Sequence, residues 1–212
     1  MTRIRAAWWI IAPAVSILAS GCVGTYGGTA TNGSVISGDR SGKGGVNSEA
    51  HLPIAPSFDG RSNRKNNGTA YEPCVAITSA IAVRLGLEAA TVSDVATIPN
   101  DPVRGCRWKS SLGYSEWTLS QIATNWKSLD SYRSYQQGAM ITWLPDAQVR
   151  GRTVGVYRER PGTYIPACVT YVQSGQAGVI TMVTNAYRQK SQFDECAKAL
   201  EVTDAVIDQI PR

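Results

Sequence analysis

The chain has 212 residues, of which 43% are hydrophobic and 17% are charged, and its formal net charge is +5. Residues 70–212 hold 14 basic and 13 acidic side chains, so the positive charge is not concentrated in the part of the chain that can form a core. Nucleic-acid-binding domains gather basic residues on one surface, and we therefore exclude a nucleic-acid partner.

The N-terminal segment has the pattern of a secretory signal. Arg3 and Arg5 precede an apolar run from Ala6 to Ala19 that contains Pro13. At about 1.5 Å per residue this run is roughly 21 Å long as a helix, which is too short for the roughly 30 Å of hydrocarbon in a bilayer. We therefore expect the chain to be exported.

The signal ends in Leu18-Ala19-Ser20-Gly21-Cys22, which resembles the bacterial lipobox. In that motif the chain is cut before the cysteine, which receives a diacylglycerol group. The usual leucine lies three places before the cysteine, whereas here that place is Ala19. We predict a lipoprotein signal peptide over 1–21 and a lipid on Cys22 that anchors the protein to the outer face of the cell membrane. The alternative is an ordinary signal peptide cut elsewhere.

Residues 23–69 hold ten of the twenty glycines and show no hydrophobic period. Such a segment buries too little apolar surface to offset the entropy lost on ordering. We predict a disordered tether over 22–69, with a reach of roughly 40 Å. Its basic residues, including Arg61, Arg64 and Lys65, would increase solubility.

Residues 70–212 have the length of one domain. Thr78 can cap a helix in which Ile77, Ile81 and Leu85 recur every four residues, and Gly86 can end it. Further along the chain we expect strands at 106–108, 115–123, 140–143 and 153–157, and a second helix at 126–132.

The last third is predicted to form a hairpin and a helix. Segments 168–173 and 179–184 are rich in β-branched residues, and residues 174–178 between them are typical of a turn. A final helix from Asp194 to Gln209 places Cys196 on its apolar face. We predict a single α+β domain over 70–212, in which an antiparallel β-sheet packs against N- and C-terminal helices.

Four cysteines remain if Cys22 carries the lipid, and an even number in an exported protein favours two disulfides. We predict the sequential pairs, Cys74–Cys106 and Cys168–Cys196, because each bond would then fasten a terminal helix to the sheet. The alternatives are free, buried thiols and a zinc site. No two cysteines are closer than 28 residues, whereas the ligands of structural zinc sites lie about two to four residues apart.

Four short motifs follow one another in the predicted domain: Glu-Pro-Cys at 72–74, Gly-Cys-Arg-Trp at 105–108, Ala-Cys-Val at 167–169 and Glu-Cys-Ala at 195–197. Behind a lipobox and a Gly- and Ser-rich tether, they resemble a family of small actinobacterial, mycobacterial-type lipoproteins whose shared domain is of unknown function. The resemblance covers residues 70–212. It implies an envelope location, paired cysteines and one α+β domain, and it implies no particular reaction.

The only histidine, His51, lies in the predicted tether, so histidine-based catalysis is excluded in the domain. Carboxylate pairs could act in glycoside hydrolysis, although solvated surface charge also explains them. The candidates for such a pair are Glu116, Asp130, Asp146 and Glu159. We expect no catalytic residue, no cofactor and no metal.

The predicted domain contains four tryptophans and eight tyrosines. Aromatic rows line sugar- and lipid-binding grooves, and they also fill cores. We expect Trp108 and Trp126 to lie in the core, and Tyr132 and Tyr135 to be partly exposed.

The leading hypothesis is a non-enzymatic envelope lipoprotein that binds an envelope protein, lipid or glycan, and such a module should expose an aromatic or apolar patch. The alternatives are a carboxylate-dependent hydrolase of cell-wall glycans and a carrier of an acyl ligand. A hydrolase needs two carboxyls within about 5–10 Å in a cleft. A carrier needs an apolar cavity of at least several hundred Å³.

Overall fold

The computed structural model of the protein describes residues 52–111, 117–159, 167–185 and 193–212. The predicted signal peptide, Cys22 and the first part of the predicted tether lie outside these residues, as do His51 and Glu116.

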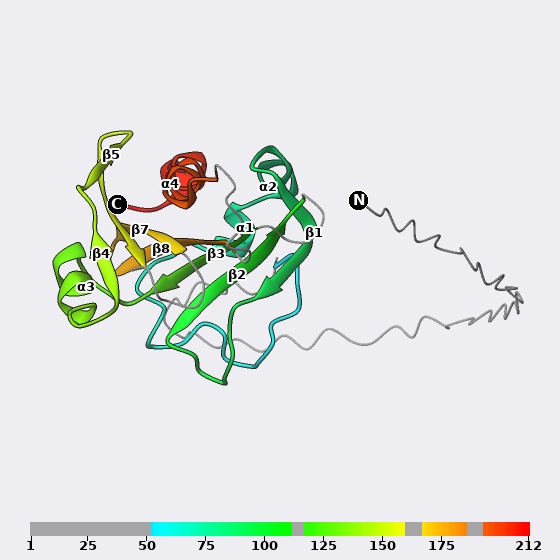
Figure 1. The fold of residues 1–212 in the computed structure, drawn as a ribbon. Helices are drawn as coiled ribbons and strands as arrows, with labels where there is room; N and C mark the ends of the chain where they lie inside the picture. Colours follow the sequence, from blue (N-terminus) through cyan, green and yellow to red (C-terminus); the bar gives the residue numbers. More distant parts are fainter. Residues whose placement is uncertain (1–51, 112–116, 160–166, 186–192) are drawn as a thin grey trace, which may run out of the picture. The chain divides into compact units, whose positions relative to one another are not determined.

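The described strands form one eight-stranded antiparallel sheet (Figure 1). The strands follow the order β1-β2-β3-β8-β7-β6-β4, and β5 pairs with β6 outside this path. Their bounds are β1 Leu87–Asp94, β2 Val103–Ser110, β3 Trp117–Thr124, β4 Ile141–Trp143, β5 Ala147–Val149, β6 Arg152–Glu159, β7 Ala167–Ser174 and β8 Ala177–Asn185. The predicted α+β class with an antiparallel sheet is confirmed.

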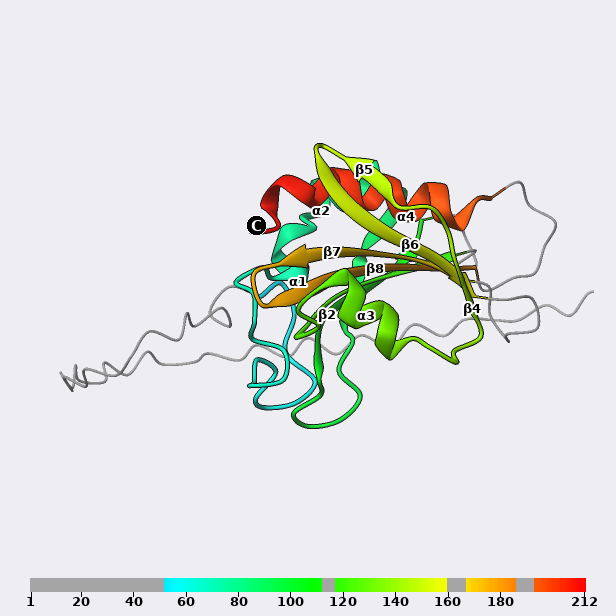
Figure 2. The ribbon, with the colours of Figure 1, turned by 90° about the vertical axis from the view of Figure 1, so that its left-hand side faces the viewer.

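Helices cover both faces of the sheet. The N-terminal helices and the last helix lie over one face, as predicted, whereas α3 lies over the other, which we did not expect (Figures 1 and 2). Their bounds are α1 Pro73–Ala76, α2 Ser79–Arg84, α3 Leu129–Tyr135 and α4 Glu195–Val206, which continues as a 3-10 turn at Ile207–Gln209. Within the described ranges, no helix has the length and apolar character needed to cross a bilayer.

The sheet therefore separates two cores, and β7 contributes to both. Cys168 and Val172 belong to the core beneath α1, α2 and α4, whereas Val169 and Tyr171 belong to the core beneath α3. Consecutive side chains of a strand point to opposite faces of its sheet, so a strand buried on both faces needs a continuous apolar run.

Both predicted disulfides are present. Cys74–Cys106 joins α1 to β2, with the Cα atoms 5.1 Å apart, and Cys168–Cys196 joins β7 to the first turn of α4, with the Cα atoms 5.0 Å apart. Each bond fastens a helix to the shared sheet, which is the reason we gave for choosing the sequential pairing.

The hairpin between β7 and β8 has a shorter turn than predicted. Ser174 pairs with Ala177, which leaves only Gly175 and Gln176 between the strands. Gly175 adopts φ of 58°, a left-handed conformation that glycine reaches without strain.

The prediction that residues 52–69 belong to a disordered tether is wrong. Leu52 and Ile54 pack against the main core, and Arg61 and Asn66 are only 4% and 0% exposed. The physical reason is that this segment is ordered by buried polar contacts and not by an apolar stripe, so a search for hydrophobic periodicity overlooks it.

Candidate functional site

The domain cysteines have a structural role. Their exposed fractions are 1% for Cys74, 0% for Cys106, 0% for Cys168 and 6% for Cys196, and all four are disulfide-bonded. A bonded and buried cysteine offers no thiolate to a substrate. The predicted lipidation residue, Cys22, lies outside the described residues.

Of the candidate carboxylates, the three that the structure describes line none of the three pockets described below. Asp130 and Asp146 both form ion pairs with Arg133, and Asp130 is 94% exposed. Glu159 is half-buried on β6, and Glu116 lies outside the described residues. The three pockets considered below have no Asp or Glu among their lining residues. Within the described ranges, no three His, Cys, Asp or Glu side chains come together in a way that could hold a metal ion.

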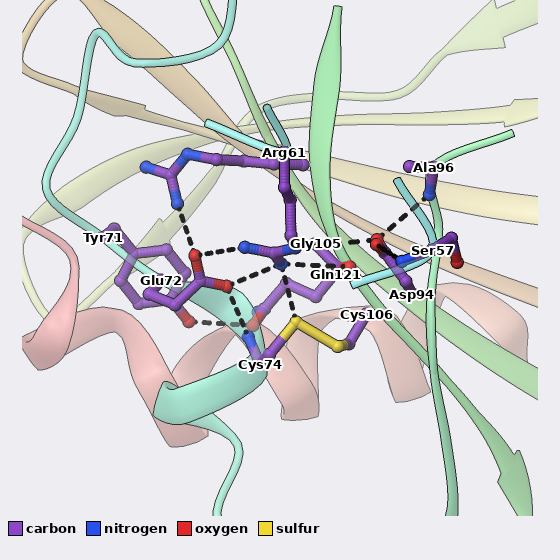
Figure 3. Close-up of a disulfide and its surroundings, with 11 residues drawn as sticks. Ser57, Arg61, Tyr71, Glu72, Cys74, Asp94, Ala96, Gly105, Cys106 and Gln121 are labelled. Atoms are coloured by element: carbon purple, nitrogen blue, oxygen red, sulfur yellow. Dashed lines mark hydrogen bonds and ion pairs between the residues drawn. A yellow bond between two sulfur atoms is a disulfide. The ribbon is translucent and has the colours of Figure 1, made fainter. Parts of the chain in front are cut away.

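A buried ion-pair network fastens residues 57–72 to the sheet (Figure 3). Arg61 donates two hydrogen bonds to the Glu72 carboxylate, of 2.7 and 2.8 Å, and its Nε lies 3.6 Å from Asp94 Oδ1. Arg104, on β2, donates a 2.8 Å bond to the same Glu72 carboxylate. Two guanidinium groups and two carboxylates thus compensate one another at a site where all four side chains are at most 8% exposed.

The same network approaches the first disulfide. Arg61 donates to Cys74 Sγ over 2.8 Å and to the carbonyl oxygen of Gly105 over 3.3 Å. A Cβ at Gly105 would collide with the backbone of Gln121 on β3, so the close approach of the two strands requires glycine here. This gives a physical reason for the glycine of the Gly-Cys-Arg-Trp motif.

Two asparagine side chains, Asn66 in the interior and Asn125 half-buried, fix the turn that carries Lys65. The Asn66 side chain donates to the carbonyl oxygens of Arg61 and Asp101, over 2.9 and 3.0 Å. The Asn125 side chain, which follows β3, donates to the carbonyl oxygen of Arg64 over 2.9 Å. Lys65 therefore stands on a turn that is bonded to the domain on both sides.

This turn forms one edge of a groove on the α3 face of the sheet, with a volume of about 410 Å³. The size is within the range of small-molecule sites. The lining residues come from four separate stretches of chain and from β8: Lys65, Pro102, Val103, Ile122, Thr124, Asn125, Trp126, Tyr132, Tyr135, Gln136 and Ile180.

One wall of the groove is aromatic. The rings of Trp126 and Tyr135 lie 4.1 Å apart, and Tyr132 stacks on Tyr171 at 5.0 Å. Tyr135 is 62% exposed, as predicted, whereas Tyr132 is only 3% exposed, contrary to prediction. Trp126 is half-buried at the groove rather than enclosed in a core, and it precedes α3 instead of lying on it.

Tyrosine hydroxyls support the aromatic wall from within. The hydroxyls of Tyr132 and Tyr157 are 2.9 Å apart, and Gln136 donates to the Tyr132 hydroxyl over 3.2 Å. Burial raises the pKa of both phenols, so they remain neutral hydrogen-bonding groups. The wall is thus held by packing and by hydrogen bonds.

The polar lining residues, which we call the polar wall, are Lys65, Thr124, Asn125 and Gln136, and Gln136 hydrogen-bonds to Tyr132 of the aromatic wall. Lys65 is exposed, and it is the only charged side chain among the described residues that line the groove. No ion pair to its ammonium group occurs within the described part of the chain. The groove thus joins an aromatic surface to a single positive charge.

The other two pockets are weaker candidates. A pocket of about 420 Å³ contains Arg152, but this guanidinium already donates to the backbone carbonyls at the end of the last helix, such as that of Ile210 at 2.6 Å. A pocket of about 280 Å³ lies beside Cys74 and Trp108, under the exposed side chain of Val75. Neither joins aromatic rings to a polar wall in the manner of the α3-face groove.

Part of the groove could be anticipated from the sequence and part could not. The spacing of Tyr132 and Tyr135 indicated an aromatic helix face. Lys65 was missed because it stands in a segment of tether-like composition, and Ile122 and Ile180 because strands distant in sequence bring them together.

A family model described as "Protein of unknown function (DUF3558)" matches residues 17–209. No curated protein and no solved structure matches the chain significantly.

Proposed function

The chain belongs to DUF3558, a family of proteins of unknown function, and we propose that it is an exported, lipid-anchored binding module of the cell envelope. In this proposal the α3-face groove binds an envelope ligand, and the module does not transform what it binds. The observation that carries the proposal is the groove itself, which combines exposed and half-buried aromatic rings with a fixed polar wall.

The sequence supports the anchor. A basic start, a short apolar run and the lipobox-like segment that ends at Cys22 are typical of bacterial lipoproteins. The family match begins at residue 17 and so takes in Cys22, as expected if relatives share the anchor. Resemblance to small actinobacterial lipoproteins supports the same location, and residues 23–51 would then form the tether.

A role without catalysis fits the chemistry of the groove. Its lining residues include neither a carboxylate nor a histidine, which are the usual proton donors and acceptors of hydrolases. Its aromatic side chains and amides are groups that recognise a ligand by stacking and hydrogen bonding.

The binding role is tested by photo-crosslinking in cells. A photoreactive phenylalanine derivative at position 135 places the probe at the groove, and the same derivative at position 83 is the matched control. Val83 is 68% exposed on α2, over the opposite face of the sheet. We expect one defined adduct from position 135 and none from position 83. Equal labelling at both positions, or none at 135, would contradict a binding role for the groove.

The anchor is tested separately by Cys22→Ala. We expect the variant to leave the membrane fraction and to lose the mass of the lipid. A variant that still partitions into detergent would show that something other than Cys22 holds the protein at the membrane.

A further inference from the structure

We propose that the ligand of the α3-face groove is a sugar ring that carries a negatively charged group, a phosphate or a carboxylate, with Lys65 as its counter-charge. This inference rests on the proposed function and names the ligand class of the same groove. The two walls of the groove and the way in which Lys65 is held provide three separate arguments.

The aromatic wall suits the apolar face of a sugar ring. The exposed ring of Tyr135, packed against Trp126, offers a π surface with a negative face. The C–H bonds on one face of a pyranose carry partial positive charge and stack on such a surface. A groove of about 410 Å³ is open to a ligand of this kind.

The polar wall suits the hydroxyl groups of the same ring. Amide side chains provide donors and acceptors side by side, which match neighbouring hydroxyl groups of a sugar. Asn125 and Gln136 are both half-buried there. Asn125 accepts a hydrogen bond from the backbone N–H of Gly68 and donates one to the carbonyl oxygen of Arg64, and Gln136 donates to the Tyr132 hydroxyl. A fixed amide loses less entropy on binding than a mobile one.

Lys65 favours a ligand that carries a negative charge. No acidic side chain lines the groove to neutralise it, so an anionic ligand group gains a charge-assisted hydrogen bond. The turn that carries Lys65 is also fixed by hydrogen bonds. The backbone N–H of Lys65 donates to Asn63 Oδ1 over 2.9 Å, and Arg104 donates to the carbonyl oxygen of Asn66 over 3.0 Å. The buried ion-pair network thus positions Lys65 at the edge of the groove.

The test is calorimetric titration of the full-length protein in nanodiscs of zwitterionic phospholipid. The probes are a set of hexose 6-phosphates and hexuronates, the matching neutral hexoses, and inorganic phosphate. We expect at least one charged sugar to bind, and to bind roughly tenfold or more tightly than either its neutral counterpart or phosphate alone. In a parallel titration followed by fluorescence, the emission of the Trp126 indole should shift.

Variants separate the role of Lys65 from a general effect of charge. Lys65→Gln should weaken the charged sugar about tenfold while leaving the neutral sugar unchanged, and Lys65→Arg should restore most of the affinity. Lys109→Gln is the matched control, because Lys109 is also exposed and lines none of the three pockets. Tyr135→Ala should weaken charged and neutral sugars alike.

Other outcomes would overturn the inference. If inorganic phosphate binds as tightly as a sugar phosphate, Lys65 is a simple ion site. If a fatty acid binds and no sugar does, the groove binds acyl ligands. If no sugar binds but the crosslink at position 135 still forms, the proposal of a sugar ligand is wrong and the proposal of a binding module stands. If the crosslink is lost as well, both proposals are wrong.

Nanodiscs with and without a glucuronosyl diacylglycerol distinguish a glycolipid headgroup from a free sugar as the source.

Discussion

Charged residues have two distinct roles in this protein, and burial separates them. Arg61, Glu72 and Arg104 are withdrawn from water and hydrogen-bonded to one another, whereas Arg150 and Asp204 form an ion pair in which both side chains are about half exposed. Exposed pairs contribute little to stability, because solvent screens them. Buried charges are different, because the loss of one partner leaves another without compensation.

Glu72→Gln should therefore destabilise the fold strongly. Among the ion pairs of these two buried guanidinium groups within the described residues, the substitution leaves the one between Arg61 and Asp94. We expect the free energy of unfolding to fall by about 3–5 kcal/mol. Glu88→Gln is the control, since Glu88 is exposed on β1, and it should change stability by less than about 0.5 kcal/mol. Urea denaturation of both variants measures the difference. Equal effects would contradict the importance of the network.

Buried tyrosines should make the protein sensitive to alkali. Burial raises the pKa of Tyr71, Tyr132, Tyr157 and Tyr171 above the ordinary value near 10. Above that pH the unfolded chain releases phenolic protons that the folded chain retains. The stability held below pH about 10 should thus be lost as the pH rises further.

Denaturation curves recorded at several pH values check this expectation. The loss of stability above pH about 10 should be shallower in Tyr157→Phe, which removes one of the buried phenols. Tyrosine absorbance should show those ionisations only when the protein unfolds. Ionisation of all tyrosines in the folded state would contradict the observed burial.

At the scale of elements, the sequence was most informative where one signal dominated. Thr78 caps α2, as its position before an apolar pattern predicted, and Asp194, predicted as the start of the last helix, is the residue that caps α4. β1 was missed because its burial is mostly partial, with Leu87 as its one fully buried residue. β5 was missed because three residues beside a turn carry no pattern of their own.

The second disulfide should stabilise one element in particular. Cys168–Cys196 closes a loop with a sequence separation of 28 residues, for which the loop-entropy estimate is on the order of 3–4 kcal/mol. Replacement of both cysteines by serine should lower the unfolding free energy by about that amount and increase amide exchange in α4 more than in α2. Uniform exchange over both helices would show that the bond does not act on α4.

At the scale of the whole molecule, the sequence located one folded region but placed its start too late. Composition distinguishes apolar stripes from polar linkers, and residues 52–69 have the composition of a linker. Their order depends on Arg61 and Asn66, whose partners lie at residues 72, 101 and 104. Such long-range polar contacts leave no period in the sequence, which is also why the groove, assembled from distant segments, was not foreseen.

Truncation tests the corrected boundary. A chain that begins at residue 52 should be about as stable as the full protein, whereas one that begins at residue 70 loses Arg61 and should be less stable by at least about 3 kcal/mol. Limited proteolysis followed by mass spectrometry should yield a resistant fragment that begins near residue 52. A resistant fragment that begins near residue 70 would show that residues 52–69 belong to the tether and not to the folded domain.

The central claim is that the α3-face groove holds a ligand in the envelope. Native mass spectrometry of the protein, extracted gently from the cells that make it, tests this claim most directly. We predict a non-covalent adduct on the wild-type protein and on Val83→Ala, and its loss from Tyr135→Ala. An adduct that survives Tyr135→Ala unchanged, or a wild-type protein without any adduct, would contradict the claim.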